Sequence, residues 1–217
     1  LGSWVELTRL WESFERFERD EHPDPGAALE GVAERFGIES YQQLFWATWF
    51  SLSAHTHPER ALAILDANAT SLPVLGQPAF VGAWSVLRPV IVGLIRLGEH
   101  ARAAGFYPLV LEMASQGLTC DVGGLTETTA GIAAAAGEQW DAADRHFARA
   151  LIAANEMPHV PDQADIRYWH SWMLLARRAV GDVESARVML GEAAPMFERA
   201  GRKRRLRECG ELLPAAE

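Results

Sequence analysis

The stretch GEQWDAADRHFARALIAAN, residues 137–155, decides the fold of this chain. Small or apolar side chains recur within it at the spacing i, i+4, i+7, i+8 and i+11, which places them on one face of an α-helix. They are Ala143, Phe147, Ala150, Leu151 and Ala154. Mostly polar and charged residues fill the positions between them, so the stretch predicts an amphipathic helix with one buried side.

The same spacing recurs three more times along the chain. Its opening alanines stand at positions 61, 103, 143 and 186, so the period is 40 to 43 residues. Only Asn68 departs from the rule of small or apolar side chains. Self-similarity at this scale is typical of repeat proteins, in which each unit packs against its neighbours. The further copies comprise Ala61, Leu65, Asn68, Ala69 and Leu72; Ala103, Tyr107, Val110, Leu111 and Ala114; and Ala186, Leu190, Ala193, Ala194 and Phe197.

A helix-breaking residue stands just before each copy, namely Pro58, Gly98, Gly137 or Gly181. Glycine readily adopts the left-handed conformation that ends a helix, and proline suits the first turn of the next one. Upstream of each break lies a second stripe with helical spacing. The clearest of these stripes consists of Ile166, Trp169, Met173, Ala176 and Val180. The repeating unit is therefore predicted to be a pair of antiparallel helices joined by a short turn.

These patterns predict an all-α protein, a right-handed solenoid of about five antiparallel helical hairpins. Residues 1–38 are expected to form an irregular N-terminal hairpin, residues 39–200 four further hairpins, and residues 201–217 a C-terminal helix or tail. Strand signals are weak because no window combines alternation with an Asn-Gly or Asp-Gly turn. The N-terminal hairpin would use Trp4, Leu7, Trp11 and Phe14 in its first helix and Ala28, Val32 and Phe36 in its second.

Three prolines fall inside the predicted helices, at positions 89, 108 and 195. Proline inside a helix removes one backbone hydrogen bond and crowds the preceding turn. Bends are therefore expected at all three positions.

Composition and charge narrow the range of functions. The net charge of −9 repels a phosphate backbone, which argues against nucleic acid as a partner. The basic run from Arg202 to Arg207 is the local exception, interpreted as a solvated terminal helix or as a contact for an acidic neighbour or nucleic acid. Two cysteines without paired spacing predict a reducing, cytoplasmic setting. No apolar run reaches the roughly 18 residues that span a bilayer, and Leu1-Gly2-Ser3 begins no signal peptide, so a segment of a longer protein is expected.

Residues 137–143, followed by Phe147 and Ala150, resemble the second helix of a tetratricopeptide (TPR) repeat, with its glycine turn, small residue, aromatic residue and second small residue. Residues 181–186 with Leu190 and Ala193 repeat the pattern. The period exceeds the roughly 34 residues of a TPR, and the first-helix pattern is poorly kept.

The arginine- and alanine-rich style of these repeats resembles the C-terminal region of large bacterial signalling ATPases. Those proteins link an NTPase core to a nucleotide cyclase or to a LuxR-type helix-turn-helix. The TPR resemblance covers about residues 40–200. Because no phosphate-binding Gly-Lys loop is present, an ATPase would lie outside this chain.

Residues that an enzyme or a metal site requires form no recognisable pattern. There is no Gly-flanked nucleophilic serine, no His-Glu-x-x-His helix and no dinucleotide-binding glycine motif. His55 and His57 could share a metal ion, but exposed polar residues also collect at hairpin turns. Asp141, Asp144 and His146 are expected on the solvent-facing side of a second helix. The sequence therefore predicts no catalytic activity, no metal and no cofactor.

Aromatic and charged side chains on the expected first helices are candidates for binding, because first helices line the concave groove in the TPR family. Tryptophan supplies a large apolar contact area, and arginine can bind a carboxylate or phosphate. Alternatively the tryptophans pack between hairpins, as expected for Trp169, and the charges form ion pairs such as Arg88 with Glu127. A pocket is expected between Trp84, Arg88, Glu127 and Arg167. The candidate residues are Trp49, Trp84, Arg88, Glu127, Arg167, His170 and Trp172.

Three functions fit this prediction. The first is a non-catalytic protein-interaction or scaffold module in a larger cytosolic signalling or transcriptional regulator, because stacked hairpins create extended concave surfaces. Its partner would be a protein, a peptide or another domain of the same chain. The second is a sensor that holds a small molecule or peptide in an aromatic and arginine-lined pocket. The third is a structural spacer or dimerisation surface. No membrane partner is expected.

Overall fold

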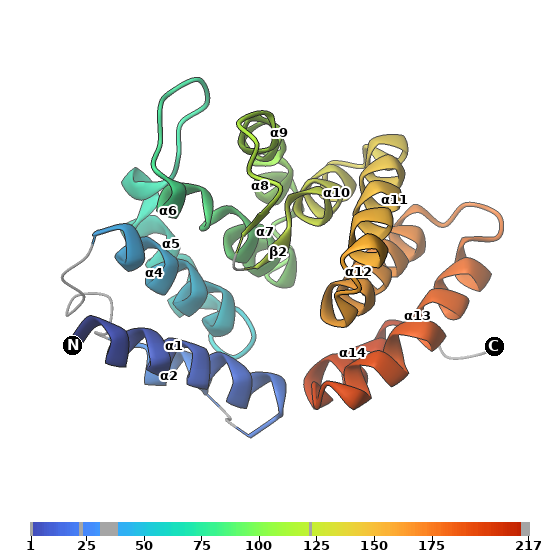
Figure 1. Cartoon of the computed structure of the whole chain (residues 1–217), viewed down its shortest axis with the longest axis horizontal. Helices are drawn as coiled ribbons and strands as arrows, with labels where there is room; N and C mark the ends of the chain where they lie inside the picture. Colours follow the sequence, from blue (N-terminus) through green and yellow to red (C-terminus); the bar gives the residue numbers. More distant parts are fainter. Residues whose placement is uncertain (1, 22–23, 31–38, 122, 214–217) are drawn as a thin grey trace.

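The computed structural model of the chain is all-helical apart from one antiparallel pair of two-residue strands (Figure 1). It describes residues 2–21, 24–30, 39–121 and 123–213. None of the helices in these ranges is both long and apolar enough to cross a bilayer. The elements are α1 (Gly2–Glu18), α2 (Pro25–Ala28), α4 (Glu39–Ser53), α5 (Pro58–Ala67), η1 (Ala69–Ser71), α6 (Val81–Trp84), α7 (Leu87–Arg96), α8 (His100–Ala104), α9 (Tyr107–Ser115), β1 (Cys120–Asp121), β2 (Gly124–Leu125), α10 (Thr126–Ala136), α11 (Trp140–Glu156), α12 (Val160–Arg177), α13 (Asp182–Arg199) and α14 (Lys203–Leu212).

Consecutive helices pack in pairs, as the repeat predicts. Within the described ranges α4 packs on α5, α7 on α8, α10 on α11 and α12 on α13. Each second helix starts three or four residues before one of the alanines that open the repeated pattern. These alanines, Ala61, Ala103, Ala143 and Ala186, are all fully buried. The four positions are therefore equivalent in the structure. The predicted second helix of the N-terminal hairpin, with Val32 and Phe36, lies outside the described residues.

The turns between paired helices each contain a residue with a left-handed backbone or a proline. Gly98 and Gly181 have φ angles of +75° and +87°, a conformation that residues with a Cβ adopt at a cost. At the turn that follows α10, Gly137 keeps a negative φ and Glu138 takes the left-handed conformation instead. Pro58 stands at the start of α5, where its missing amide costs no hydrogen bond.

At two of the three prolines the chain breaks close to the predicted bend. Pro108 lies in the first turn of α9, and the chain breaks between α8 and α9 just before it. This break alters the direction of the side chains that follow, so Leu111 is 41% exposed although the repeat predicts its burial. Pro89 likewise lies in the first turn of α7, just after the break between α6 and α7. Pro195 lies within the continuous helix α13, and a bend there stays a prediction.

Two apolar cores hold the helices together. The larger core runs from α4 to α14 and contains the fully buried Phe50, Phe147 and Trp169. The smaller core joins α1 to α4 through residues that include Leu10 and Phe45. Trp169 thus occupies the core position predicted from its stripe.

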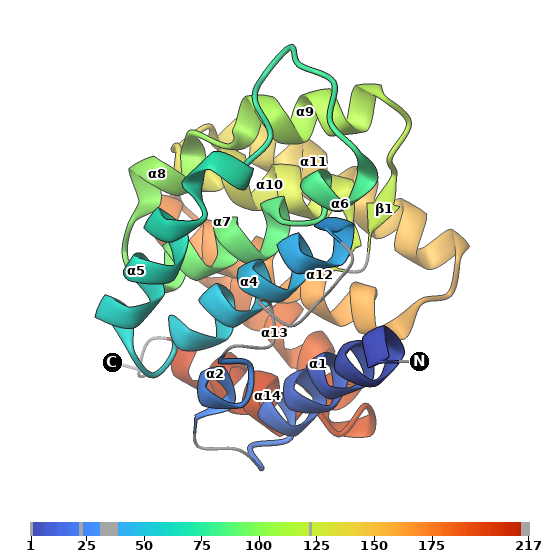
Figure 2. The same ribbon diagram turned by 90° about the vertical axis from the view of Figure 1, so that its left-hand side faces the viewer.

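The chain curves round until its last helix meets its first. Figures 1 and 2 both show α14 beside α1, and residues of the two helices are in contact. The described helices therefore form a closed ring around an interior space. This closure was not predicted, because each repeat contacts only its neighbours in an open solenoid.

A substitution at Gly131 tests the packing of the α10–α11 pair. A Cβ added to Gly131 would lie 2.9 Å from Cε1 of Phe147, which is fully buried and has little room to move. Gly131→Ala should therefore destabilise the protein by about 1–3 kcal/mol, although alanine favours helix by about 1 kcal/mol.

Gly191 on α13 provides the matched control, since a Cβ added there meets no atom within 4 Å. Gly191→Ala should stabilise the protein by up to about 1 kcal/mol. Urea unfolding followed by circular dichroism measures both changes. Stabilisation by both substitutions would contradict the close approach of α10 and α11.

Candidate functional site: an arginine-lined pocket

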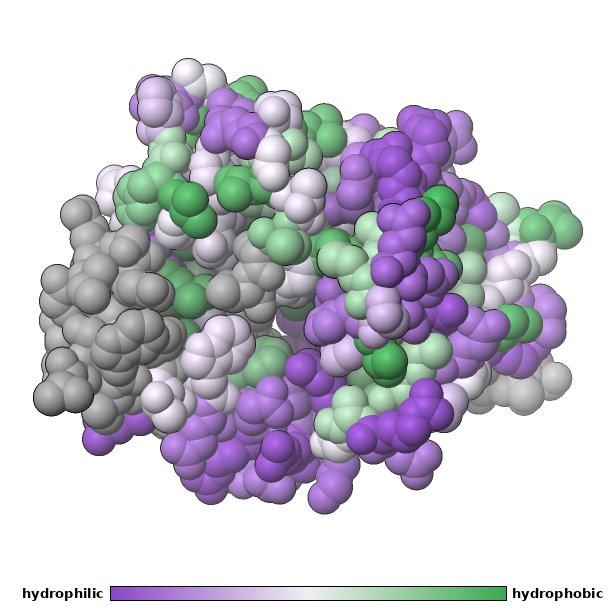
Figure 3. All heavy atoms as spheres, viewed as in Figure 1, coloured by the Kyte–Doolittle hydropathy of each residue, from purple (hydrophilic) through white to green (hydrophobic). Residues whose placement is uncertain are grey.

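A pocket of about 660 Å³ lies inside the ring, lined by residues from α1, α4, α7, α12 and α14. Figure 3 shows a hollow at the centre of the face viewed there, with hydrophilic side chains below it. Its volume lies within the range of about 300–1,000 Å³ that is usual for small-molecule sites. The apolar lining includes Leu10, Phe14, Leu44, Leu52 and Val92, and the charged lining includes Glu15, Glu18, Arg88, Arg96, Asp165, Arg202, Arg204 and Arg205.

Helix α14 brings two of the arginines to the pocket. Gly201, with φ of +69°, ends α13 and lets the chain reverse into α14. Arg204 and Arg205 follow in its first turn and are only 4% and 9% exposed. The interpretation of this basic run as a solvated terminal helix is therefore wrong for these two residues. They are buried because carboxylates surround them.

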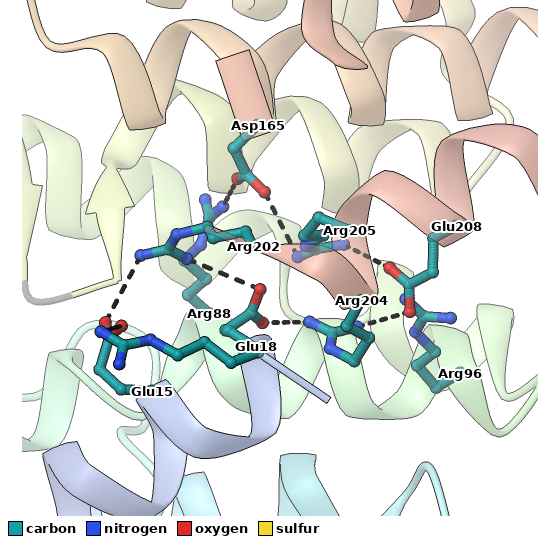
Figure 4. Close-up of polar contacts among 10 residues, drawn as sticks. Glu15, Glu18, Arg88, Arg96, Asp165, Arg202, Arg204, Arg205 and Glu208 are labelled. Carbon is teal, nitrogen blue, oxygen red and sulfur yellow. Dashed lines mark hydrogen bonds and ion pairs between the residues drawn. The ribbon is translucent and has the colours of Figure 1, made fainter. Parts of the chain in front are cut away.

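Ion pairs between α1 and α14 close the ring. Arg204 pairs with Glu18, which is 1% exposed, and its guanidinium lies 4.3 Å from the ring centroid of Phe17 (Figure 4). Arg207 pairs with Asp20 at the exposed edge of the same contact. Glu18 is the last residue of α1, where the helix dipole disfavours a negative charge. Its burial at this position therefore depends on Arg204.

Two further carboxylates connect α14 to the ring interior. Asp165 of α12 pairs with Arg88 and, at 3.3 Å, with Arg205. Glu208 lies behind the pocket wall and pairs with Arg96, with Arg204 and, at 3.2 Å, with Arg205. Figure 4 shows these groups as one continuous network. Each charge that leaves water thus gains at least one opposite charge, which burial of an ion requires.

The network changes the protonation of the groups beside it. Burial by itself would raise the pKa of the Glu208 carboxyl, but Arg205, Arg204 and Arg96 outweigh it and lower the pKa to about 2. Burial, followed by the charges of Arg96 and Arg204, lowers the pKa of His55 to about 2. His55 lines the pocket and is therefore neutral at pH 7.

Of the seven predicted groove residues, only Arg88 lines this pocket. The predicted pair of Arg88 with Glu127 is replaced by a pair with Asp165. Glu127 instead accepts hydrogen bonds from Arg149 at 2.9 Å and contacts His146 at 2.6 Å. His146 is 6% exposed, so its predicted position on the solvent-facing side is wrong. It is buried because the Glu127 carboxylate binds its ring.

The other predicted groove residues are dispersed. Arg167 and His170 line a second pocket of about 320 Å³ between α11, α12 and α13. Trp84 is 2% exposed and belongs to the core. Trp49 and Trp172 are partly buried against the core. The predicted pocket between Trp84, Arg88, Glu127 and Arg167 does not form as one site.

The two histidines considered as metal ligands do not converge. Nε2 of His57 lies 3.0 Å from the Asp24 carboxylate, whereas the ring of His55 packs 4.8 Å from that of Phe17. In the part of the chain that the structure describes, no three potential ligands gather as a metal ion would require.

Several residues of the pocket were missed at the level of sequence. Glu18, Asp165 and Glu208 were not among the predicted site residues. The only signal in the sequence is the spacing of Arg204 and Glu208 at i and i+4, which allows an ion pair on one helix but does not reveal the burial of that face.

Comparison of the chain with protein-family models, with characterised proteins and with solved structures found no match. What the pocket can bind is therefore inferred from its own side chains.

Replacement of Glu18 tests the closure of the ring. Glu18→Gln leaves the buried Arg204 with a single carboxylate partner, and loss of one member of a buried ion pair typically costs about 3–5 kcal/mol. Glu12 on the exposed side of α1 is the control, because its pair with Arg16 at 4.0 Å is solvent-exposed. Glu12→Gln should change stability by less than about 0.5 kcal/mol. Equal effects in urea unfolding would show that Glu18 does not hold the ring closed.

The acid limb of the stability profile tests the Glu208 network. The folded protein keeps Glu208 ionised down to a pKa of about 2, whereas the ordinary value is 4.5. Its contribution should be complete above about pH 4.5 and should disappear as the pH falls towards 2. The free energy of unfolding, measured across this pH range, should fall more steeply for the wild type than for Glu208→Gln. The exposed Glu211→Gln variant should show the same pH dependence as the wild type. The same pH dependence in Glu208→Gln would contradict the pairing.

Proposed function

We propose that the chain is a non-catalytic sensor module that binds a small molecule or short peptide in the arginine-lined pocket. The observation that carries this proposal is the position of the pocket, which is lined by α1 at one end of the chain and by α14 at the other. A ligand there would contact both ends of the ring at once. Binding would therefore stabilise the closed arrangement over any open one.

The arrangement of paired helices supports a TPR-like, right-handed solenoid of about five hairpins as the architecture around this pocket. The four equivalent alanines and the packing of consecutive helices favour it. In such a solenoid the inner surface is the usual place for a partner. By its resemblance to the repeats of signalling ATPases, the module would belong to a larger cytosolic regulator.

The chemistry of the lining favours binding over catalysis. Arginine remains protonated throughout the physiological range and cannot act as a general base. The carboxylates of Glu18 and Asp165 are held by arginines. His55, with a pKa of about 2, is too weak a base to accept a proton near pH 7.

A second candidate, a surface for protein partners, is favoured by the segment between α5 and α7. Figure 2 shows this segment projecting from the body of the protein. Val74, Leu75, Phe80 and Val81 lie on it and are 47–65% exposed. Exposed apolar groups of this size often mark protein contacts. This interface would give the regulator a partner outside the pocket.

A fragment screen tests the sensor function. Ligand-observed NMR with the full chain should detect fragments that also raise the melting temperature in a saturable manner. Val92→Trp places a large side chain in the pocket and should weaken their binding by at least about tenfold. Val180→Trp is the control because Val180 is fully exposed and distant in sequence from every lining residue.

Circular dichroism must show that Val92→Trp remains helical; if it does not, Thr48→Phe fills the pocket from α4. Fragments that bind equally to a folded pocket-filled variant would refute the pocket as the site. Absence of any fragment binding to the wild type would refute the sensor function and favour the exposed segment.

A further inference from the structure

The charges that line the pocket differ from those of the chain as a whole. The protein has 29 acidic residues against 20 basic ones. In contrast, five arginines and four carboxylates line the pocket, and one of the carboxylates, Asp162, contacts His159 at 3.0 Å. Glu208 behind the wall balances the one arginine in excess, so the pocket is close to neutral although the protein as a whole is acidic. An anion therefore meets less repulsion there than the net charge of −9 would impose. Burial, followed by the charges of Arg96 and Arg204, lowers the pKa of His55 on the same wall.

Arg202 is the least firmly held of these arginines. Its contacts with Glu15 and Glu18 are both 3.8 Å, longer than hydrogen bonds. Its side chain is 26% exposed and its guanidinium lies 5.7 Å from the ring centroid of Phe14. Figure 4 shows it between these two glutamates and the Arg88–Asp165 pair. Its N–H groups can thus turn to an incoming acceptor without breaking a short ion pair.

Some polar atoms of the network have no hydrogen-bond partner. Nε of Arg204 and Nε of Arg96 are buried and have no hydrogen-bond partner. Oε2 of Glu18 is likewise unpaired, and it faces Nη1 of Arg202 across the 3.8 Å gap.

Apolar side chains form another part of the pocket lining. Leu44 and Leu52 of α4, Val92 of α7 and Leu10 of α1 contribute to it. A fully hydrated inorganic anion would leave these side chains in contact with water, whereas an apolar group would cover them. The two parts of the lining together fit a molecule with one charged end and one apolar end.

From these contacts we propose, building on the sensor function, that the ligand is an amphiphilic acid. Its carboxylate or phosphate accepts hydrogen bonds from Arg202, because a guanidinium group binds either oxyanion in a bidentate manner. Its apolar body contacts the wall formed by α4 and α7. Binding joins the α13–α14 turn to α4 and α7 through the ligand, so the acid stabilises the closed ring.

Matched probes with one seven-carbon alkyl chain test this assignment. Octanoate, heptyl phosphate and the neutral octanamide differ only in the head group and are titrated into the full chain by calorimetry. At least one acid should bind about tenfold or more tightly than octanamide, with an affinity that decreases from about 20 mM to about 500 mM salt. The better of the two acids identifies the oxyanion. An octanamide affinity equal to that of both acids would overturn the proposal.

Arg202→Gln removes the charge and retains a hydrogen-bonding side chain, so it should abolish the preference for the acids. Arg187→Gln on α13 is the control, since Arg187 pairs with Glu184 at the surface. A folded Arg202→Gln variant that still prefers the acids to octanamide would also overturn the proposal. If that variant does not fold, the proposal is tested by the wild type alone: an affinity for the acids that does not change with salt would overturn it.

The three probes could bind the wild type with equal affinity and fail to bind Val92→Trp. That result would place them in the pocket without a preference for charge, so it would support the sensor function and refute only the amphiphilic-acid proposal. Absence of binding by every probe to the wild type would overturn the amphiphilic-acid proposal, and the fragment screen then decides the sensor function separately.

Discussion

The buried ion pair between Glu18 and Arg204 is the contact on which the shape of this protein depends. It joins the last residue of the first helix to the last described helix, across 186 positions of sequence. Both groups are at least 96% buried. Because an unpaired charge in such surroundings would be strongly destabilising, each residue fixes the position of the other. The stacked pairs of helices thereby become a closed ring.

Apolar packing and charge pairing have different roles in this fold. Burial of alanines and aromatic rings, such as Ala143 and Phe147, forms each pair of helices and stacks it on the next. This interaction has little directional preference, so by itself it would permit a range of curvatures. Arginine–carboxylate pairs require defined geometry, and they select the curvature at which α14 reaches α1. The polar network between α1 and α14 thus selects one of the arrangements that the apolar packing of the helices permits.

The same network determines what the interior pocket offers to a ligand. Asp165 and Glu208 hold Arg88 and Arg205 against the wall, whereas Arg202 at the turn before α14 has only long contacts. A pocket with fixed cations, one adaptable cation and an apolar wall can distinguish ligands by their charged end. Since both α1 and α14 contribute to the pocket, binding of a ligand in the pocket and closure of the ring are coupled.

The sequence by itself determined the local structure. Stripes at helical spacing and the residues at the turns identified the paired helices and the buried alanines at 61, 103, 143 and 186, because these features depend on interactions within and between adjacent helices. It identified Arg88 as a binding candidate but placed Trp84 in a groove and Arg204 in solvent. Only the tertiary structure decided the ring and its pocket. The physical reason is that the meeting of α1 and α14 depends on the packing angles of all the helices between them, which no local pattern of residues encodes.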